Sequence, residues 1–463
     1  MPAVRLARVW PVLLIAALIG LALRTAAALG GLWLDEAWSA AYARDVVTPA
    51  GVLLNINHDN NHHLNTLWLQ LVGFGADPLI QRALSIACGT LTVLVAGAIA
   101  ARRGIEAAAV TAMLFAASPI LVTYGSEARG YAPMLLALMG SIALVDRWLD
   151  ARERPAPAIG LAVLAVLGML AQLTMAFGLV AIAGWILLRV WRDEGLQRAV
   201  AALVRAQAIP LASGVAVAAL VFGIAHAQGG FQFGAVAPFQ GGLFVFVLGE
   251  TAAWTFGLPP HRAIAATAIV VTLLALLVVR SVQPRAAFYA LAIIGLPAAV
   301  ALLTLPNSAI GRYYLLSVVA LLLLAGEVAG SALRKRGILR WITLAVLCII
   351  LVGSAVRDLT ITGDGRGDPS RAVAEMAPRA PKGATATVER ARAAPVLEVA
   401  AASRGYRLAL EPCGRFLFVD RDGTEPFPAA PILCGQRYRL IAGADPAGLS
   451  GTHWRLYERQ TTP

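Results

Sequence analysis

Two adjacent carboxylates, Asp35 and Glu36, are the side chains whose type and position most plainly suggest chemistry. They stand in the sequence Gly-Leu-Trp-Leu-Asp-Glu-Ala-Trp-Ser, directly after the first long apolar stretch of the chain. Carboxylates are costly to desolvate at a membrane boundary and add nothing to packing, so a chemical role is expected. A carboxylate there can act as a general base, because it can take the proton from an attacking hydroxyl group. A helix cap is the simpler interpretation, but it explains only one of the two residues.

A second charged pair, Glu127 and Arg129, lies in Tyr-Gly-Ser-Glu-Ala-Arg-Gly-Tyr, which ends at Tyr131. A later arginine, Arg312, precedes Tyr313 in Gly-Arg-Tyr-Tyr. Arginine stays charged and can hold two phosphate oxygens at once, so both arginines are candidates for binding a departing phosphate. The tyrosine hydroxyls can donate further hydrogen bonds, although tyrosine is also common in the aromatic belt of membrane proteins. The plainer alternatives are a salt bridge between Glu127 and Arg129, and an Arg312 side chain that extends to the membrane surface.

The elements that must position these side chains are transmembrane helices. The chain has 463 residues, of which 59% are hydrophobic and only 14% are charged, and its mean hydropathy is +0.73. A soluble protein could not bury so much apolar surface, so the composition indicates a multi-pass membrane protein. The net charge of +12 comes largely from arginines in short gaps between apolar runs, with no basic patch interleaved with aromatic residues. Binding to nucleic acid is therefore not expected.

Eleven apolar segments have the length that a membrane-spanning helix needs, about 17–25 residues. Arg5 and Arg8 precede the first segment and place the N-terminus in the cytoplasm by the positive-inside rule. Residues 63–74 are too short to cross and are expected to lie along the interface, whereas residues 240–257 are expected to form an interfacial or re-entrant helix. The expected spans lie at about residues 10–29, 78–101, 105–122, 131–149, 157–174, 176–191, 207–226, 262–280, 286–305, 313–330 and 339–356.

An odd number of spans puts the C-terminal part of the chain outside the cytoplasm. We therefore expect a transmembrane domain at residues 1–356 and an extracytoplasmic domain at residues 357–463, which is polar and rich in Pro and Gly. The expected fold class is an all-α polytopic membrane domain of about eleven helices followed by a small α/β domain. The helix-like and β-like runs of the second domain are Arg371–Met376, Pro395–Ser403, Arg415–Val419 and Arg437–Ile441.

Two of the four cysteines, Cys413 and Cys434, fall in the expected extracytoplasmic domain, whereas Cys88 and Cys348 lie inside expected spans. An oxidising compartment allows a disulfide between Cys413 and Cys434, which would stabilise a small domain by about 2–4 kcal/mol. The alternative is a pair of unpaired buried thiols. No Cys-x-x-Cys or Cys/His spacing indicates a structural zinc site.

With this topology the unusual polar residues lie in outer loops, and their motifs resemble those of the polyprenol-phosphate-dependent glycosyltransferases of the GT-C superfamily. That group includes protein O-mannosyltransferases and the aminoarabinose transferase of lipid A. The motif that begins at His62-His63 lacks the pair of prolines that the family usually has there. The resemblance runs from about residue 9 to residue 330 and rests on Asp35-Glu36, His62-His63-Leu-Asn-Thr-Leu-Trp68 through Phe74-Gly75, Glu127-Ala-Arg-Gly-Tyr131 and Gly311-Arg-Tyr-Tyr314.

The resemblance implies a GT-C fold and a glycosyltransferase that moves a sugar from a polyprenyl-phosphate donor to a cell-envelope acceptor, which can be a glycan, a lipid or a protein. It implies an inverting, single-displacement reaction in which Asp35 is the general base and Glu36 orients the acceptor or neighbouring groups. The Ala-, Arg- and Gly-rich composition fits a bacterial inner membrane protein. The residues expected to bind the donor phosphate or the substrate are Arg129, Arg312, Glu127, His62, His63, Tyr131 and Tyr313.

No cofactor is expected. His58, Asp59, His62 and His63 offer possible ligands for a divalent metal, but the interleaved asparagines equally suit hydrogen bonding to a sugar or a phosphate. The resemblance implies transfer without a metal. Two other functions stay open, a flippase or transporter of lipid-linked sugars and a protein like an O-antigen ligase or polymerase. A flippase is expected to carry ionisable residues near span centres, and an O-antigen ligase carries Arg and His in a large late outer loop.

Overall fold

The computed structural model describes residues 3–234, 236–259, 263–423 and 425–460, and the chain divides into two compact units. Unit 1 comprises Met1–Arg24, Ser85–Gly125 and Gly130–Arg357, and unit 2 comprises Thr25–Leu84, Ser126–Arg129 and Asp358–Pro463. The side chains of Arg5 and Arg8, on which the expected orientation of the N-terminus rests, lie outside the described part. Each unit thus collects segments that are far apart in the sequence, and the domain boundary expected at residues 356 and 357 stays a prediction.

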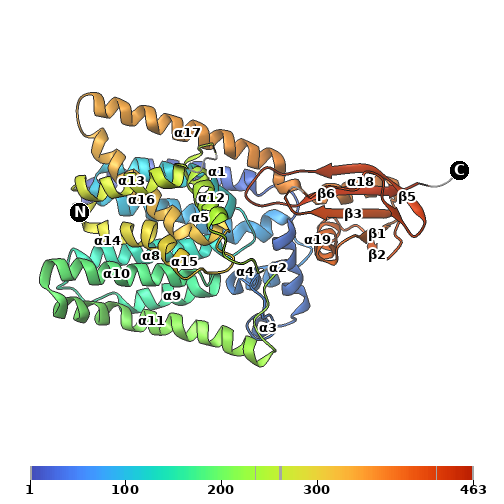
Figure 1. Ribbon diagram of the computed structural model, residues 1–463, viewed down its shortest axis with the longest axis horizontal. Helices are drawn as coiled ribbons and strands as arrows, with labels where there is room; N and C mark the ends of the chain where they lie inside the picture. Colours follow the sequence, from blue (N-terminus) through green and yellow to red (C-terminus); the bar gives the residue numbers. More distant parts are fainter. Residues whose placement is uncertain (1–2, 235, 260–262, 424, 461–463) are drawn as a thin grey trace. The chain divides into compact units, whose positions relative to one another are not determined.

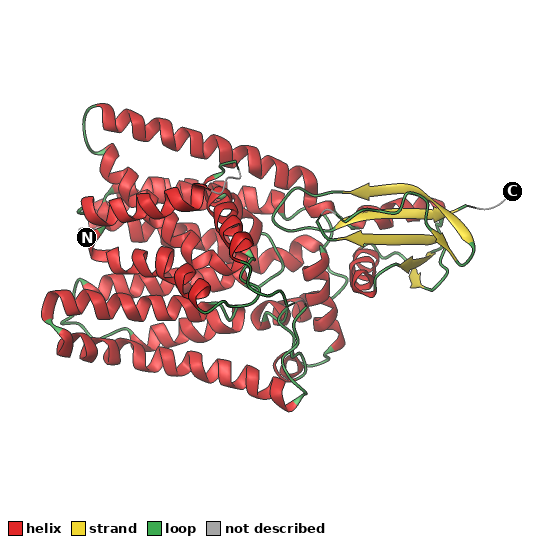
Figure 2. Cartoon of the chain, viewed as in Figure 1, coloured by secondary structure: helices red, strands yellow, loops and turns green. Residues whose placement is uncertain are grey.

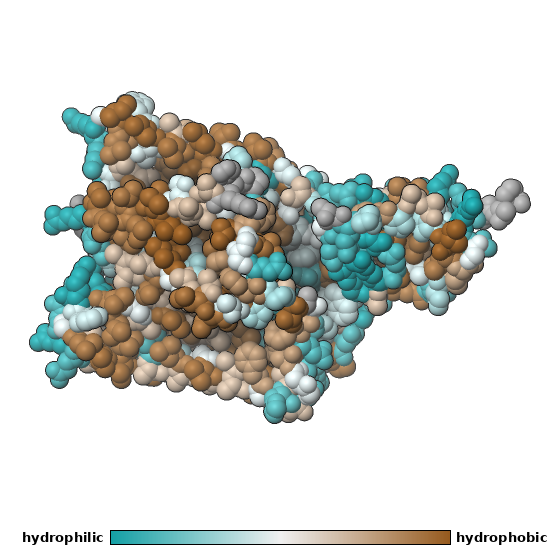
Figure 3. All heavy atoms as spheres, viewed as in Figure 1, coloured by the Kyte–Doolittle hydropathy of each residue, from teal (hydrophilic) through white to brown (hydrophobic). Residues whose placement is uncertain are grey.

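Unit 1 consists of helices, which Figures 1 and 2 show as a bundle without strands among its described residues. Figure 3 shows hydrophobic residues over much of the visible surface of these helices, as expected where lipid replaces water. The helices that lie wholly or mostly in unit 1 are α1 (Ala3–Ala27), α5 (Pro78–Ala100), α6 (Ile105–Ala117), α7 (Pro119–Tyr124), α8 (Tyr131–Leu149), α9 (Ala158–Ala171), α10 (Met175–Glu194), α11 (Leu196–Ala227), α12 (Gly241–Phe256), α13 (Ala263–Val278), α14 (Ala286–Tyr289), α15 (Leu296–Leu302), α16 (Leu315–Leu333) and α17 (Ile338–Asp364), with the shorter turns η1 (Ala101–Arg103), η2 (Gln283–Arg285), η3 (Ala290–Gly295) and η4 (Gly311–Tyr314).

The multi-pass membrane assignment is confirmed by the helices that are long and apolar enough to cross a bilayer. Within the described ranges there are eight, Val9–Ala27, Pro78–Arg103, Tyr131–Leu149, Met175–Glu194, Leu196–Ala227, Gln283–Leu302, Gly311–Leu333 and Ile338–Gly367. Each of them overlaps one of the expected spans over most of its length.

Within the described residues, the helices at the other three expected spans are shorter than the sequence predicts; residue 262, where the last of these spans is expected to begin, lies outside the described residues. In their places stand α6, α9 and α13, with 13, 14 and 16 residues. Helices of this length reach roughly 20–24 Å, less than the roughly 30 Å of a bilayer core. The first of them, predicted at residues 105–122, ends early because Ser118 precedes Pro119, whose ring disfavours the helical conformation of the residue before it.

A buried ionic cluster joins three of the membrane-spanning segments of unit 1. Arg285 is fully buried and donates to both carboxylate oxygens of Asp146, with Nε to Oδ1 at 2.8 Å and Nη2 to Oδ2 at 2.7 Å. It also contacts Glu327, which accepts a hydrogen bond from the hydroxyl of Tyr289 at 3.0 Å. Charges are costly within a bilayer unless they are paired, and these charges pair with one another. Nothing in the local sequence around these residues predicts the cluster.

Unit 2 contains a mixed sheet with the strand order β2-β1-β3-β6-β5-β4. Strand β1 runs parallel to β2 and β3, whereas β6 is antiparallel to β3 and β5. Helix α19 connects the parallel pair β1 and β2, as a parallel crossover requires, and the small α/β domain is therefore confirmed. The elements of this sheet region are α18 (Ser370–Arg379), β1 (Ala384–Val388), α19 (Ala394–Ser403), β2 (Leu408–Leu410), β3 (Phe416–Arg421), β4 (Ile432–Leu433), β5 (Gln436–Ala444) and β6 (His453–Arg459).

The central strand β3 is buried on both faces, because successive side chains of a strand point to opposite sides. Phe416 and Phe418 lie in one hydrophobic core together with Trp454, and the ring centroids of Phe418 and Trp454 are 5.5 Å apart. Leu417 and Val419 lie in a second core on the other side. The sheet is therefore the middle layer of unit 2.

The segment between the first two long apolar helices also belongs to unit 2, with α2 (Leu34–Asp45), α3 (Pro49–Leu54) and α4 (His63–Val72). Ala37, Ala40 and Ala43 of α2 lie in the same hydrophobic core as the sheet and α19. Small side chains at this helical spacing let α2 approach closely. The indole N–H of Trp38 adds a hydrogen bond to the carbonyl of Arg392 at 3.0 Å. Helix α2, which carries the acidic pair, is thereby anchored to the C-terminal part of the chain.

Cys413 and Cys434 form a disulfide between the segment before β3 and the turn before β5, across a sequence separation of 21 residues. Replacing Cys413 by Ser is expected to lower the free energy of unfolding by about 3 kcal/mol, because the unfolded chain regains conformations that the bridge excludes. Thermal unfolding of the purified protein measures this loss. Cys348→Ser is the matched control, since Cys348 is an exposed free thiol. Equal stability of the two variants would contradict a stabilising bridge.

Candidate active site

The segment between α1 and α2 is held in place by Arg82, near the beginning of α5. Its Nη1 donates to the carbonyl oxygens of Ala28 at 2.7 Å and Gly30 at 2.8 Å, and its Nη2 donates to that of Gly31 at 2.9 Å. Arg82 is fully buried. A guanidinium carries five N–H donors in a planar fork, so it can satisfy several backbone carbonyls that would otherwise be buried without partners. The loop that leads into α2 is thereby fixed.

Glu36 is the charged partner of Arg82, and both side chains are fully buried. Nε and Nη2 of Arg82 donate to Oε1 and Oε2 of Glu36 at 2.8 and 2.5 Å. The same carboxylate accepts the backbone N–H groups of Trp33 at 3.1 Å and Ala128 at 2.6 Å. The bond to Trp33 is local, because Glu36 is the third residue of α2 and its side chain turns back to the residue before the helix.

The ionisation of Glu36 follows from these contacts. Burial alone would raise the pKa of Glu36, but the charge and hydrogen bonds of Arg82 outweigh it, so that the pKa is lowered. Four donors occupy the two oxygens of Glu36, and its side chain has no exposed surface. This arrangement favours a positioning role for Glu36. A direct role in catalysis stays a prediction.

Glu36 and Asn65 together fix both sides of the short segment at Ala128. Glu36 accepts the N–H of Ala128, and the buried Asn65 donates from Nδ2 to its carbonyl oxygen at 2.5 Å. Asn65 belongs to α4, so α2 and α4 both hold this segment. The segment carries the charged residues of the Glu-Ala-Arg motif, Glu127 and Arg129, and their backbone positions therefore depend on the two helices.

Arg129 forms an ion pair with Asp35, with 2.8 Å between Nη1 and Oδ2. Its Nη2 also donates to Oδ1 of Asn60 at 2.7 Å, and Nδ2 of Asn60 donates to the backbone oxygen of Asp35 at 2.8 Å. The three residues thus form a closed set of contacts. The side chain of Arg129 is 3% exposed, whereas that of Asp35 is 25% exposed. The structure therefore brings Asp35 and Arg129 together and leaves the carboxylate of Asp35 accessible.

Glu127 is fully buried beside Arg366, with 3.9 Å between Oε1 of Glu127 and Nε of Arg366. Arg366 also donates to the carbonyl oxygen of Ala27 at 2.5 Å and to the hydroxyl of Ser126 at 2.6 Å. Burial raises the pKa of Glu127, and the positive charges of Arg366 and Arg129 oppose this only in part. A buried carboxyl of this kind holds a proton closer to neutral pH than an exposed one does.

The segment between α17 and α18 supplies Arg366 and a second anchor, Asp368. Both residues have left-handed backbone, with φ of 54° and 34°. Non-glycine residues keep this conformation where their surroundings hold them, which is common at functional sites. Oδ1 of Asp368 accepts the N–H of Gly31 at 2.7 Å, and the hydroxyl of Thr452 accepts the N–H of Leu34 at 3.1 Å. The loop before α2 is therefore also held by the C-terminal part of the chain.

His62 and His63 are both buried at the beginning of α4. Burial lowers the pKa of His63 to about 4, so its ring is neutral at neutral pH and can offer a phosphate or sugar only hydrogen bonds. Among the side chains that the structure describes, no group of three or more His, Cys, Asp or Glu is arranged to hold a metal ion. Independence of metal and the substrate-binding roles of the two histidines stay predictions.

Three predicted site residues, Tyr131, Arg312 and Tyr313, belong to unit 1 and are described within it. Tyr131 is buried at the first position of α8, with its ring centroid 5.2 Å from that of Tyr124. Arg312 and Tyr313 lie in η4, and the guanidinium carbon of Arg312 is 5.9 Å from the ring centroid of Tyr313. That these three residues share a site with Asp35 stays a prediction.

Four residues that hold this site were not predicted from the sequence, namely Arg82, Asn60, Asn65 and Arg366. Both asparagines lie within motifs that the sequence marks, and Asn60 is one of the interleaved asparagines predicted to hydrogen-bond a sugar or a phosphate; the structure shows it bonded to Arg129 and to the backbone of Asp35. Arg82 also had a signal, because a charged residue in the first turns of an apolar span needs a partner. Arg366 follows the last span in a glycine-rich stretch, and no local pattern marks it.

Comparisons with known proteins identify the fold. No protein-family model matches the chain, and a search of curated proteins finds no relative. The crystal structure of ArnT from Cupriavidus metallidurans bound to undecaprenyl phosphate matches with a TM-score of 0.52 and 13% identity, over 97% of this chain and 98% of ArnT. The crystal structure of the Archaeoglobus fulgidus oligosaccharyltransferase in its apo form matches with a TM-score of 0.46 and 15% identity, over 86% of this chain and 64% of the archaeal one. The ArnT match confirms the expected GT-C-like fold over nearly the whole chain.

The buried pair of Glu36 and Arg82 predicts that folding depends strongly on Arg82. Replacing Arg82 by Met is expected to lower the free energy of unfolding by about 3–5 kcal/mol, because Glu36 is left buried without its charged partner. The double replacement of Arg82 by Met and Glu36 by Gln is expected to be less destabilising than Arg82→Met alone. Thermal unfolding of the purified variants measures both effects. If Arg82→Met proved as stable as Arg371→Met, which removes an exposed arginine of unit 2, the pair would not anchor the loop.

Proposed function

We propose that the protein is an integral-membrane glycosyltransferase that moves a sugar from a polyprenyl-phosphate donor to a cell-envelope acceptor. The observation that carries the proposal is the contrast within the acidic pair. Asp35 is 25% exposed and held by Arg129, whereas Glu36 is fully buried against Arg82. The fold supports the donor class, because it is shared with ArnT, whose structure holds undecaprenyl phosphate. The proposed location is the bacterial inner membrane, with the N-terminus in the cytoplasm and the site and the C-terminal domain outside.

In the proposed reaction Asp35 is the general base. An acceptor hydroxyl attacks the anomeric carbon of the donor sugar, and its proton passes to the carboxylate of Asp35. The bond between that carbon and the phosphate oxygen breaks, and the polyprenyl phosphate leaves with the bonding electrons. A single displacement of this kind inverts the configuration at the anomeric carbon. Glu36 is saturated by its donors, which disfavours a retaining mechanism with two working carboxylates about 5 Å apart.

Arg129 has a different role in this proposal from the one that its motif predicts. Two of its nitrogens are engaged by Asp35 and Asn60. We therefore assign Arg129 as a positioning residue that fixes the orientation of the Asp35 carboxylate, since a base must meet the proton at hydrogen-bonding distance. Arg312 is then the leading candidate for binding the departing phosphate, with Tyr313 as a possible hydroxyl donor.

Glu36 contributes to the same positioning through the backbone. It holds the N–H of Ala128, and the next residue along the chain is Arg129. A shift of Glu36 would therefore move Arg129, and with it the carboxylate of Asp35. In this proposal the two adjacent acidic residues have different roles, because the carboxylate of Asp35 is partly exposed and that of Glu36 is not.

Replacing Asp35 by Asn is expected to reduce sugar transfer by about 10²–10⁴-fold while the protein stays folded, because the general base is lost. Transfer is measured with the purified protein, a panel of radiolabelled polyprenyl-phosphate sugars and envelope extracts. The matched control is Asp77→Asn, which makes the same chemical change at an exposed carboxylate that accepts the N–H of Leu79. Asparagine also caps helices, so this control is expected to keep full activity.

The transfer assay, together with an assay of donor movement in liposomes, separates the transferase from a flippase. Retained turnover in Asp35→Asn would overturn the assignment of the base. Movement of labelled donor between the leaflets of liposomes, without label entering any acceptor, would instead identify a flippase of lipid-linked sugars. The ion pairs of the Arg285 cluster are internal to unit 1 and give no specific support to a transport function.

The proposed roles of the two arginines predict different defects. Arg129→Gln is expected to lower the turnover number by about 100-fold with little loss of lipid binding, because the base is misplaced. Arg312→Gln is expected to weaken the binding of polyprenyl phosphate by about tenfold, because a charge-assisted hydrogen bond is lost. Binding is measured by retention of radiolabelled undecaprenyl phosphate and turnover by sugar transfer. The opposite pattern, with lipid binding lost in Arg129→Gln and kept in Arg312→Gln, would exchange the two roles.

A further inference from the structure

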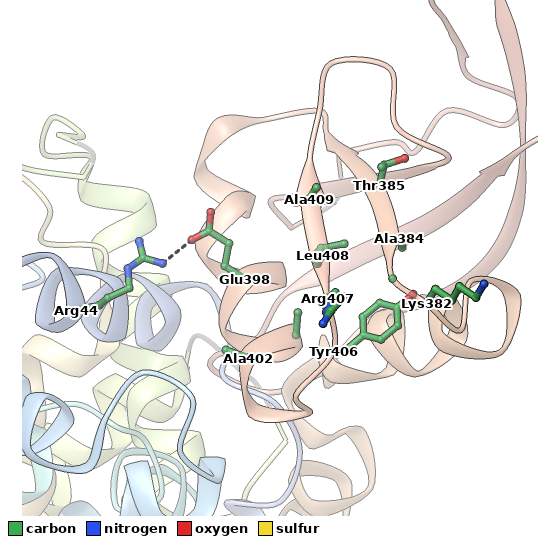
Figure 4. Close-up of a pocket in the computed structure, with 12 residues that line it drawn as sticks. Arg44, Lys382, Ala384, Thr385, Glu398, Ala402, Tyr406, Arg407, Leu408 and Ala409 are labelled. Carbon is green, nitrogen blue, oxygen red and sulfur yellow. Dashed lines mark hydrogen bonds and ion pairs between the residues drawn. The ribbon is translucent and has the colours of Figure 1, made fainter.

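A pocket of about 680 Å³ opens on unit 2 at the C-terminal end of α2 (Figure 4). Its lining comes from the last turn of α2, the turn before β1, the end of α19 and the strands β1 and β2. Figure 4 shows the ion pair between Arg44 and Glu398 on one side of the pocket and Lys382, Tyr406 and Arg407 on the other. The pocket therefore gathers charged and aromatic side chains from several elements.

Positive charge predominates in this pocket. The charge of Arg44 is matched, because its guanidinium lies 2.8 Å from carboxylate oxygens of both Asp45 and Glu398. Lys382 and Arg407 are exposed, and neither forms an ion pair with a carboxylate of the described residues. Three cationic side chains thus face a single lining carboxylate, and two of them are available to a ligand. A concave site with an excess of one sign of charge attracts ions of the opposite sign.

The other lining groups suit a sugar better than a bare ion. The hydroxyl of Tyr406 donates to the carbonyl oxygen of Ala380 at 2.7 Å, which fixes a partly exposed aromatic ring beside the two free cations. Leu408 and Ala409 add apolar surface. An aromatic ring with apolar neighbours offers a face on which the C–H groups of a sugar ring can rest, while nearby charged donors bind an acidic substituent. The pocket therefore combines the two features that an acidic sugar requires.

The pocket and the proposed base stand at opposite ends of one helix. Asp35 is the second residue of α2, and Arg44 is its penultimate residue. At 1.5 Å and about 100° per residue these nine steps span about 14 Å along the helix axis and end half a turn around it, so a glycan that joins the two ends must also pass around α2. An extended oligosaccharide covers this distance with a few sugar units. Because both ends belong to the same anchored helix, the distance between them is fixed.

From these observations we infer that the pocket binds an acidic sugar, carrying a carboxylate or a phosphate, within an extended acceptor glycan whose reacting hydroxyl lies at Asp35. The inference rests on the proposed transferase function and narrows its acceptor to an acidic glycan. Lys382 and Arg407 would hold the anionic group, and Tyr406 would support the sugar ring. Binding at this pocket does not require transfer, so it can be tested separately.

The test is the binding of hexameric oligogalacturonate to the full-length purified protein by isothermal titration calorimetry, with maltohexaose as the uncharged hexamer. Oligogalacturonate is expected to bind more tightly than maltohexaose. The double replacement of Lys382 and Arg407 by Ala is expected to weaken its binding at least about tenfold, because two charge-assisted contacts are lost. The matched control replaces Arg437 and Arg439, two exposed arginines of β5, by Ala and removes the same net charge. This control is expected to bind oligogalacturonate like the unmodified protein.

Three results would overturn the inference. The first is equal binding by the pocket variant and the β5 control, which would mean that net charge alone attracts the glycan. The second is equal binding of oligogalacturonate and maltohexaose. The third is that inorganic phosphate binds as tightly as oligogalacturonate and displaces it from the protein. The pocket would then be a site for isolated anions.

Glycan binding at the pocket and the proposed transferase function can be tested, and contradicted, independently of each other. Oligogalacturonate binding that persists in Asp35→Asn and is lost in the pocket variant supports the pocket, even if no donor yields transfer. Transfer that is abolished by Asp35→Asn, together with unchanged oligogalacturonate binding in the pocket variant, would keep the transferase and overturn the pocket. Lys382 and Arg407 are exposed, so their replacement is not expected to affect folding, and the thermal midpoint of the variant checks this.

Discussion

The buried pair of Glu36 and Arg82 is the interaction on which the candidate site depends. Removing two full charges from water is strongly unfavourable unless their hydrogen-bonding groups find other partners. Here Arg82 donates to Glu36 and to three backbone carbonyls, and Glu36 also accepts two backbone N–H groups. The charges thus satisfy backbone groups that a loop would otherwise leave unpaired. In return the loop before α2 and the segment at Ala128 are fixed, which a site that must position reacting groups requires.

The C-terminal part of the chain takes part in this support. Arg366 and Asp368 hold the loop before α2 and the segment after Ser126, and Thr452 holds the first turn of α2. The alanines of α2 lie in the same hydrophobic core as the sheet. Unit 2 is therefore built from segments near both ends of the chain. The helix that carries the site and the sheet pack into the same hydrophobic core. Because α2 packs into this core, its position, and with it the position of Asp35, depends on the packing of the sheet.

The sequence predicted features that are local and missed those that depend on distant partners. Apolar length located the membrane-spanning helices, and β-like runs of residues located β3 and β5, because these signals are contained within a few turns or residues. Pro119 was a local signal that should have shortened the span at residues 105–122. The partners of Arg82 and Arg285, in contrast, lie far away in the chain, and which carboxylate an arginine meets is decided by tertiary packing. The acidic pair could be singled out from the sequence. Which of its two carboxylates is buried and which is accessible could not be predicted.

That division follows from helix geometry. Asp35 and Glu36 are the second and third residues of α2, and successive residues of an α-helix point about 100° apart. Two neighbours can therefore face different environments, Glu36 toward the buried guanidinium of Arg82 and Asp35 toward Arg129, where its own carboxylate stays partly exposed. The longer side chain takes the inward position, where it reaches both Arg82 and the backbone N–H of Trp33. The shorter one stays close to the helix, where its ion pair with Arg129 fixes its direction. Adjacent acidic residues thus give one buried anchor, Glu36, and one accessible carboxylate, that of Asp35. Through the backbone at Ala128, Glu36 sets the position of Arg129, which orients the carboxylate of Asp35.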